Sequence, residues 1–389
     1  TDTTEKGFES LIVNWLVNHN GYEQGQNRDY NTEYALDTAR LFCFLKNTQP
    51  DAVKKLQLET NPQKTAQFLA RVRDEITKRG IVDVLRKGIK AYPASLIMFY
   101  MTPSVNNPAA AALYAKNIFS VTRQLHFSPD ATKLSLDLCI FVNGLPVITF
   151  ELKNQLTKQN ADDAVYQYQH DRNPKELLFQ FTRCMVHFAV DDVQVKFCTR
   201  LQGKESWFLP FNKGYKDGAG NPPNPDGLMT DYLWKQILTK DMLSRIIENY
   251  ATLVEEKDEE TGKTRYKQIF PRYHQLTAVE SLLADVKKNG VGNRYLIQHS
   301  AGSGKSNSIA WLAHQLTGLE DAQGNLLVDS VIVVTDRVVL DKQIRDTIRQ
   351  FAQTRNIIAW AEHSGDLRKA IEDGRRIIIT TIEKFPYVL

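Results

Sequence analysis

The feature that most constrains the fold is a glycine-rich segment at residues 298–306, which reads QHSAGSGKS. A short apolar run at 294–297 precedes it and predicts a buried strand, and a helical pattern at 307–316 follows it. Gly302 and Gly304 allow a tight turn, so that successive backbone N–H groups can point toward one anion at the start of a helix. The order of strand, tight turn and helix therefore predicts a phosphate-binding loop in an α/β domain.

The side chains of this loop have separate expected roles. Lys305 would place a positive charge beside the β- and γ-phosphates of a nucleotide, and the hydroxyl of Ser306 would bind the accompanying Mg²⁺. The strict motif has a first glycine where this sequence has His299, so the match is to the shorter G-x-G-K-S core. A surface loop rich in glycine and serine is the alternative. The expected nucleotide-binding residues of the loop are Gly302, Ser303, Gly304, Lys305 and Ser306.

Length and composition exclude several classes of protein. The 389 residues suffice for two or three domains, and 42% hydrophobic with 24% charged residues is typical of a globular chain. No apolar run is as long as a membrane span, and residues 1–6 lack the features of a signal peptide. The four cysteines show no C-x-x-C spacing, so we expect free thiols in a cytoplasmic protein without a membrane partner. The net charge of +4 permits a nucleic-acid partner without demonstrating one.

The first half of the chain combines helices with a strand-rich region. Helical spacing of apolar residues occurs at about 4–18, 32–46 and 62–79. Strand patterns then dominate from 81 to 200, with one helix near 160–171. This order predicts a mixed α/β domain.

The second half begins with helix-like sequence at 228–253 and a polar run at 255–263, which suits a hairpin tip or a domain junction. From about 270, helices alternate with apolar strands at 294–298, 331–335 and 377–381. This alternation is typical of a parallel α/β sheet. The expected parts of the chain are an α/β domain at 1–225, a helical connector at 226–262 and a second α/β domain at 263–389.

Two neighbouring strand patterns bring charged residues to one face. The apolar residues of both strands, at 136–142 and 148–152, are even-numbered. Because side chains alternate along a strand, the odd-numbered face carries Asp137, Glu151 and Lys153. Two carboxylates beside a lysine suit a Mg²⁺ site, in which the metal activates water and the lysine neutralises developing charge. An exposed hairpin face with ordinary charges is the alternative.

The turn between the two strands decides whether the carboxylates face each other. Asn143-Gly144 is a strong hairpin signal. A two-residue turn there would place Asp137 opposite Phe150, whereas a three-residue loop or a β-bulge would place it opposite Glu151. We expect the second arrangement, with the two carboxylates about 4–6 Å apart and able to share one Mg²⁺.

The pattern of Asp137 followed by Glu151-x-Lys153 is similar to the core of the PD-(D/E)XK nucleases. The surrounding segments resemble, in the same order, the N-terminal part of the motor (R) subunit of type I restriction endonucleases. The resemblance covers nearly the whole chain, and its segments are 80–86, 117–124, the hairpin, 210–214 and 218–222. It implies a PD-(D/E)XK nuclease-like domain followed by a partial RecA-like lobe of a superfamily 2 translocase.

The resemblance implies roles for further residues near the hairpin site. Glu9 matches an acidic residue that supports the metal site, although a solvated helix charge would look the same. Gln167 matches the first residue of a Q-x-x-x-Y motif, but Asp171 stands at the tyrosine position. The catalytic residues expected on this basis are Asp137, Glu151, Lys153, Gln167 and Glu9, with Asp137 and Glu151 as the metal ligands.

In the second half, Gln275 in the sequence RYHQ resembles the glutamine that contacts the adenine of ATP. Residues 333–337 (VVTDR) and 380–385 (TTIEKF) resemble motifs that touch the DNA backbone in such motors. No D-E-x-H box follows them, so we expect an amino-terminal fragment that binds nucleotide weakly and does not translocate by itself.

The resemblance also implies a function for the whole subunit. It would hydrolyse ATP to pull double-stranded DNA past a complex of methyltransferase (modification) and specificity subunits, and would cleave that DNA with Mg²⁺. The alternatives are another nuclease–helicase fusion and a non-catalytic module that tethers DNA.

Overall fold

The computed structural model separates into two compact units. The first comprises Thr1–Pro103 and Pro108–Phe270, and the second comprises Ser104–Asn107 and Pro271–Leu389. The segment that we expected as a connector, 226–262, belongs to the first unit in this division. The residues that the structure describes are 5–154, 158–257, 262–336, 338–351, 358–361 and 363–387.

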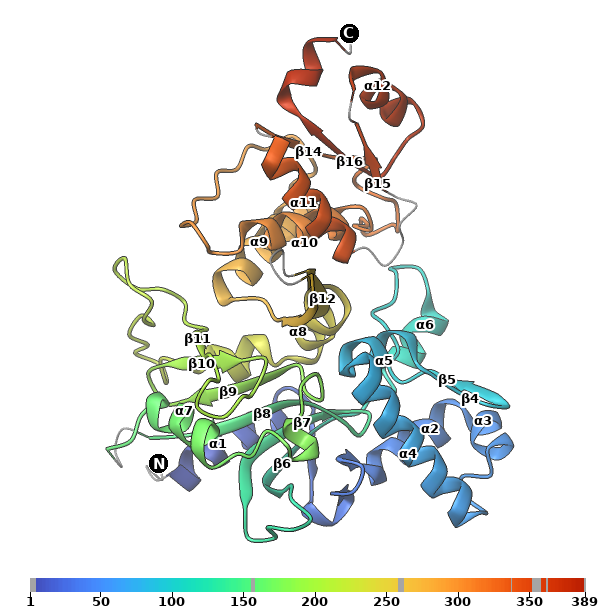
Figure 1. Cartoon of the computed structure of the whole chain (residues 1–389), viewed down its shortest axis with the longest axis vertical. Helices are drawn as coiled ribbons and strands as arrows, with labels where there is room; N and C mark the ends of the chain where they lie inside the picture. The colour runs from blue at the N-terminus through green and yellow to red at the C-terminus, as the bar shows by residue number, and fades with distance from the viewer. Residues whose placement is uncertain are drawn as a thin grey trace. The chain divides into compact units, whose positions relative to one another are not determined.

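A mixed sheet of seven strands forms the centre of the first unit (Figure 1). Strands β6, β7 and β8 are antiparallel neighbours, whereas β1 pairs with β6 and β8 pairs with β9 in parallel. Every residue of β8 is buried, as expected for a central strand with both faces covered. In sheet order the strands are β1 (Glu23–Gly25), β6 (Phe119–His126), β7 (Ser135–Val142), β8 (Leu145–Leu152), β9 (Val186–Val190), β10 (Val195–Cys198) and β11 (Leu209–Pro210).

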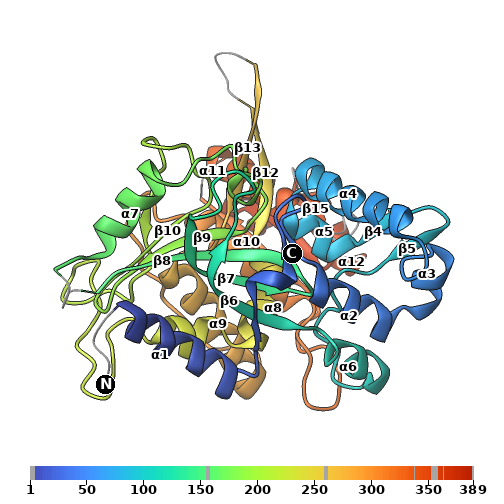
Figure 2. The same ribbon diagram turned by 90° about the horizontal axis from the view of Figure 1, so that it is seen from below.

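Two helices that the sequence predicts lie beside this sheet (Figure 2). The helix α1 (Glu5–Asn18) packs against β1 and β6, and α7 (Ala161–His170) packs against β8 and β9. Tyr168 of α7 belongs to the same core cluster as Cys139 and Phe141 of β7. Since these two β7 residues are odd-numbered, the face that we expected to be polar is largely buried. Its charged residues therefore lie at the margin of a core, not on a solvated surface.

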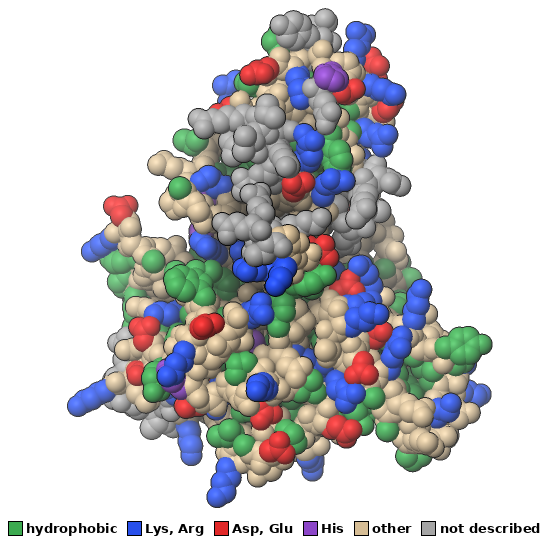
Figure 3. Space-filling model, viewed as in Figure 1, with side chains coloured by type: hydrophobic (Ala, Val, Ile, Leu, Met, Phe, Trp, Pro, Cys, Tyr) green, Lys and Arg blue, Asp and Glu red, His purple; other side chains and the backbone are tan. Residues whose placement is uncertain are grey.

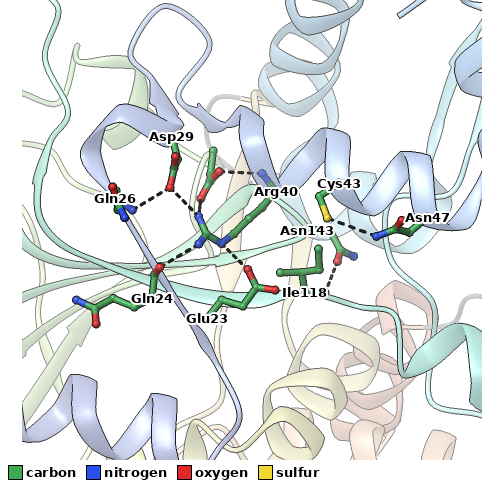
Figure 4. A network of polar contacts seen from close by, with 10 residues as sticks. Glu23, Gln24, Gln26, Asp29, Arg40, Cys43, Asn47, Ile118 and Asn143 are labelled. Atoms are coloured by element: carbon green, nitrogen blue, oxygen red, sulfur yellow. Dashed lines mark hydrogen bonds and ion pairs between the residues drawn. The ribbon is translucent and has the colours of Figure 1, made fainter. Parts of the chain in front are cut away.

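The second expected helix begins later in the chain than predicted, as α2 (Thr38–Thr48). Asp37 caps it by accepting a hydrogen bond from the backbone N–H of Arg40 at 3.0 Å. The Arg40 guanidinium also donates to the carboxylates of Glu23, Asp29 and Asp37, at 3.1, 3.2 and 2.8 Å (Figure 4). These contacts tie the first turn of α2 to β1. The residues before α2 form two short paired strands, β2 (Tyr30–Asn31) and β3 (Leu36–Asp37).

The helix predicted at 62–79 is present as α4 (Pro62–Arg79). The side chain of Asn61 caps it by accepting from the N–H groups of Gln63 and Lys64, both at 3.1 Å. Gly80 follows the last turn with φ +82°, a conformation that favours glycine. The strand-rich region also contains helices that we did not predict. The elements around α4 are α3 (Pro50–Lys55), α5 (Ile81–Lys87), the hairpin strands β4 (Ile89–Ala91) and β5 (Ala94–Leu96), and α6 (Pro108–Tyr114).

The helix predicted at 228–253 is interrupted between Ile237 and Lys240, and its last helical residue is Tyr250. Two strands, β12 (Thr252–Lys257) and β13 (Thr264–Ile269), then pair as an antiparallel hairpin. The polar run between them, predicted as a hairpin tip, includes residues 258–261, which lie outside the described part of the chain. The helical turns are Leu233–Ile237 and Ile246–Tyr250, both π-helical, with α8 (Lys240–Arg245) between them.

The second unit has the predicted alternation of helices and parallel strands, with one exception. Its three strands pair in the order β14-β16-β15, all parallel. Residues 294–298, predicted as a buried strand, have no regular structure, and Leu296 is 91% exposed. A β-strand needs a neighbouring strand with which its backbone can form hydrogen bonds. The described strands of this sheet pair only with one another, so residues 294–298 have no such neighbour among them. The elements are α9 (Tyr273–Asn289), α10 (Lys305–Leu316), β14 (Val331–Thr335), α11 (Val338–Phe351), β15 (Ile358–Trp360), α12 (Ser364–Glu372) and β16 (Ile377–Thr381).

Among the helices that the structure describes, none has both the length and the apolar composition needed to cross a lipid bilayer.

Candidate functional site

The turn between β7 and β8 consists of two residues, Asn143 and Gly144. Both adopt positive φ, at 50° and 80°. Such a pair forms the tight turn that matches the twist of a hairpin. A Cβ atom at Gly144 would lie 2.3 Å from the carbonyl oxygen of Asp37, so only glycine fits. Of the two arrangements that we predicted, a three-residue loop or a β-bulge, the three-residue loop is therefore not the one found.

A β-bulge restores the pairing that the shorter turn would have broken. The register of β7 and β8 shifts by one residue between Ile140 and Phe141. Beyond this shift Leu138 lies opposite Phe150. Continued by one residue, this register places Asp137 opposite Glu151, and the backbone N–H of the adjacent Leu152 donates to Asp137. The alternative that we predicted, a bulge that brings the two carboxylates to one face, is the arrangement found.

The carboxylate of Asp137 accepts hydrogen bonds from a backbone N–H and from a side-chain amide. Its Oδ2 accepts a hydrogen bond from the backbone N–H of Leu152 at 2.7 Å, and its Oδ1 accepts from Nε2 of Gln124 at 3.2 Å. The same Nε2 of Gln124 donates to Oε2 of Glu9 at 2.8 Å, and Arg123 donates to the other oxygen of Glu9. Glu9 and Asp137 thus share one amide group. The structure places Glu9 beside the hairpin carboxylates, whereas the sequence left open a solvated position.

Glu151 is fully buried, and its two oxygens differ. Oε1 accepts a hydrogen bond from Nε of Arg172 at 2.5 Å, whereas Oε2 has no hydrogen-bond partner among the residues that the structure describes. Burial, followed by the nearby carboxylate of Asp137, raises the pKa of Glu151 to about 8, although Arg172 opposes the rise. A buried carboxylate oxygen without a partner costs free energy in the protein alone. The arrangement therefore favours a cation at Oε2.

Arg172 is the main residue of this site that sequence reasoning missed. It follows the end of α7, is buried, and donates from Nη2 to the carbonyl oxygen of Ser135 on β7 at 2.9 Å. Its guanidinium also lies 5.5 Å from the ring centre of Phe127. No periodic pattern marks such a position. The available signal was only that a basic residue follows the helix predicted to carry Gln167.

The other expected residues lie around the same strands. Lys153 is nearly buried just beyond β8, and its charge also opposes the raised pKa of Glu151. Gln167 is half-buried on α7, and its buried Oε1 lacks a hydrogen-bond partner in the described part of the chain. Asp171, at the motif's tyrosine position, is exposed at the end of α7. The tyrosine that reaches the buried layer is Tyr168, whose hydroxyl lies 2.8 Å from Oγ1 of Thr149.

The donor set suits one kind of metal better than others. Among the described residues, no group of three or more His, Cys, Asp and Glu side chains is arranged to hold a metal ion. Mg²⁺ is commonly bound by one or two carboxylates and several waters, whereas structural Zn²⁺ needs four protein ligands. The pair of Asp137 and Glu151 therefore fits Mg²⁺.

The glycine-rich loop of the second unit leads directly into α10. Gly302 and Gly304 have φ of 71° and 83°, and α10 begins at Lys305. The Lys305 ammonium donates to the carbonyl oxygens of His299 and Ser300 at 3.1 and 2.8 Å, so it lies inside the turn of the loop. No side chain caps α10. A helix start with this geometry is suited to binding an anion.

Gln275 of α9 lies against this loop. Its Nε2 donates to the carbonyl oxygen of Gly304 at 2.8 Å, and its Oε1 accepts from the backbone N–H of Arg272 at 2.9 Å. The side-chain amide of Gln275 therefore links α9 to the loop. A Cβ atom at Gly304 would lie 2.4 Å from this Nε2, but the side-chain end can shift, so the φ of 83° is the stronger requirement for glycine there.

The two motifs predicted to touch DNA lie at neighbouring strand ends. Thr335 at the end of β14 lies opposite Thr381 at the end of β16 in the parallel register. Both side chains are buried, as is that of Thr380. Arg337, the last residue of the first motif, lies outside the described residues.

Comparison with known proteins gives two family matches. Residues 2–206 match the family described as the N terminus of the type I restriction enzyme R protein. Residues 274–387 match the family described as SWI2/SNF2 ATPase. The second unit is thus similar to an ATPase of that class, in agreement with the phosphate-binding loop predicted there.

Individual relatives agree with these matches. The chain is 28% identical over 285 residues to the type I restriction enzyme HindI endonuclease subunit of Haemophilus influenzae, which covers 70% of this chain and 25% of that protein. It is 24% identical over 274 residues to the SauCOLORF180P endonuclease subunit of Staphylococcus aureus, covering 70% and 26%. It is 21% identical over 401 residues to the putative MjaIXP endonuclease subunit of Methanocaldococcus jannaschii, covering 94% and 36%.

The chain thus spans about a quarter to a third of the length of these relatives. The match to residues 2–206 covers more than half of the 389 residues. This chain belongs to the family of type I restriction enzyme R proteins and carries the N-terminal region of that family.

Proposed function

We propose that this chain carries a Mg²⁺-dependent nuclease centre of the PD-(D/E)XK type on the β7–β8 hairpin. The observation that supports it most is the bulge, whose register continues to Asp137 opposite Glu151, where one buried oxygen of Glu151 has no partner among the described residues. A cation at that oxygen would offset the cost of its burial. The substrate in this proposal is the phosphodiester backbone of double-stranded DNA.

Asp137 and Glu151 would hold the Mg²⁺, which when bound stabilises charge on the phosphodiester and lowers the pKa of a bound water. Arg172 binds Glu151 through Oε1 only, so Oε2 remains available to the metal. Its positive charge also favours the ionised form of Glu151, which is the form that binds metal. Lys153, next to the same carboxylate, would neutralise the charge that develops on the phosphate.

Two further residues would position these groups. Glu9 fixes the amide of Gln124, and that amide donates to Asp137, so Glu9 acts through Gln124 on the orientation of a metal ligand. Gln167 has a buried Oε1 without a partner and would accept a hydrogen bond from a water in the site.

The second unit, in this proposal, binds ATP. Residues 302–306 would surround the phosphates, with Lys305 contacting the β- and γ-phosphates and Ser306 binding the Mg²⁺ of the nucleotide. Gln275 would support the loop through Gly304, in addition to any contact with adenine. The whole subunit would use ATP hydrolysis to translocate double-stranded DNA, together with modification and specificity subunits.

The test of the nuclease proposal is Glu151→Gln in the complete subunit, assembled with its modification and specificity subunits. We expect Mg²⁺-dependent cleavage of unmethylated circular DNA to be lost, while DNA-stimulated ATP hydrolysis stays near wild type. Asp130→Asn, a change of one exposed carboxylate outside the site, is the matched control and should cleave normally. Normal cleavage by Glu151→Gln, or a parallel loss of ATP hydrolysis, would contradict the proposal of a separate nuclease centre.

A further inference from the structure

A cavity of about 650 Å³ lies in the first unit, away from the residues of the hairpin site. It is bounded by the end of α3, the first half of α4 and the β4–β5 hairpin. Its lining contains no aspartate or glutamate. The charged side chains that line it are Lys55, Lys64, Arg71 and Lys90.

The sequence around this cavity carries the positive charge of the chain. Residues 51–96 contain ten Lys and Arg against five Asp and Glu, whereas the whole chain contains 49 against 45. The remainder of the chain is therefore close to neutral. Figure 3 shows Lys and Arg side chains on the surface where Figure 1 draws α4 and the β4–β5 hairpin. A concentration of positive charge on one region is the electrostatic feature expected of a nucleic-acid contact.

The cavity's lysines are not neutralised within the protein. In the described part of the chain, Lys55, Lys64 and Lys90 form no ion pair, and all three are exposed. Arg71 alone is paired, with Glu75 at 3.0 Å. The uncompensated charges therefore face the cavity and the solvent.

The position of Lys64 adds a second argument for an anionic ligand. Lys64 lies in the first turn of α4, and that turn contains no acidic residue. The start of a helix carries partial positive charge, so a lysine there is electrostatically unfavourable to the fold. Gln67 and Arg71 follow Lys64 at helical spacing and line the same cavity. An anion in the cavity would relieve the repulsion between these groups.

We propose that this cavity binds the phosphate backbone of double-stranded DNA. The cations come from three separate chain elements and line one cavity, so a row of phosphates can contact several of them. Tyr92, between β4 and β5, is 99% exposed and can donate its hydroxyl to a backbone oxygen. Contacts of this kind hold DNA without reading its sequence. The inference rests on the proposal that the chain acts on double-stranded DNA.

The test combines Lys55→Ala, Lys64→Ala and Lys90→Ala in the complete subunit. Affinity for a short DNA duplex would be measured by fluorescence anisotropy over a series of salt concentrations. Each lost phosphate contact lowers the slope of log K against log salt by about 0.9, so the triple variant should lose about 2.7 in slope. At physiological salt its affinity should fall by on the order of 10-fold or more.

Two control variants make the result decisive. The combination of Lys204→Ala, Lys216→Ala and Lys287→Ala removes the same charge from exposed positions outside the cavity and should keep the wild-type slope. Replacing the three cavity lysines by arginine should also keep it, because the charges remain. An equal loss of slope in the two alanine triples would overturn the proposal, since net charge would then explain the effect.

Two further outcomes separate this inference from the proposed function. If the cavity triple binds the duplex as the wild type does but loses affinity for inorganic phosphate, measured by isothermal titration calorimetry, the ligand is a small anion and the inference is wrong. If the wild-type complex cleaves DNA but the triple binds duplex unchanged, the inference fails and the nuclease proposal stands. If the wild-type complex neither binds nor cleaves duplex DNA, both fail.

Discussion

The hairpin site and the glycine-rich loop hold their charged groups in opposite ways. At the hairpin, Glu151 is fully buried, and its partner Arg172 comes from a different part of the chain. At the loop, Lys305 is exposed, and its ammonium donates to the carbonyl oxygens of His299 and Ser300 of the same loop. One site depends on tertiary packing and the other on local backbone geometry.

This difference has energetic consequences. Removing Arg172 leaves a buried carboxyl group without its hydrogen-bond partner, so a change at the hairpin should affect both stability and activity. An exposed lysine contributes little to stability, so a change at the loop should affect activity alone. The following variants test whether the two sites differ in this way.

The largest effect is expected at the loop. Lys305→Ala in the complete subunit should reduce ATP hydrolysis by on the order of 100-fold or more, because a charge that contacts the transferred phosphate is lost. Urea unfolding should be unchanged, since the side chain is exposed. Lys287→Ala, another exposed lysine of the second unit, serves as the control. ATP hydrolysis near wild type in Lys305→Ala would show that this loop is not the hydrolytic site.

A combined effect on stability and cleavage is expected at Arg172. Arg172→Met should destabilise the first unit by about 3 kcal/mol, because the buried carboxyl of Glu151 loses its hydrogen-bond partner, and should abolish cleavage. Arg172→Lys keeps the charge and should recover part of the cleavage, whereas Arg28→Met at an exposed position should change neither. Urea unfolding and DNA cleavage measure the two quantities. Full cleavage by a destabilised Arg172→Met protein would show that the arginine is structural only.

The smallest effect is expected from His187, a buried histidine on β9 whose Nδ1 lies 2.7 Å from Oγ1 of Thr149 on β8. Burial lowers the pKa of His187 from its ordinary 6.5 to about 3. Between these values the unfolded chain binds a proton that the folded chain does not, so stability falls as the pH decreases through this range. This contribution amounts to about 2 kcal/mol between pH 7 and pH 5.

His187→Gln should remove that part of the acid destabilisation, as measured by urea unfolding at a series of pH values. His126→Gln, at an exposed histidine, should leave the pH dependence unchanged. Identical pH profiles for wild type and His187→Gln would mean that His187 does not remain neutral in the folded state.

Local patterns in the sequence were sufficient where a structure depends on near neighbours. Asn61, Pro62 and Gly80 mark both ends of α4, and the structure has the helix at the predicted residues. The tight turn was also predicted from Gly302 and Gly304, and the helix after it from the pattern at 307–316, which the structure has as α10. In both cases, the interactions that decide the conformation join residues close together in the chain.

The strand predicted at 294–298 failed because apolar composition does not provide a partner strand. Leu296 and its neighbours are exposed, and the described strands of the second unit pair only with one another. A strand forms only when its hydrogen bonds are met by a ladder, which is not a property of the segment itself.

The sequence by itself determined which face of the hairpin carries Asp137, Glu151 and Lys153, because alternation along a strand is a local rule. Only the tertiary structure decided that a bulge sets two of them opposite each other, that α7 buries this face, and that Arg172 binds Glu151. Register, burial and ion pairing depend on residues distant in the chain. Their free energies arise only when the whole sheet and its helices have packed together.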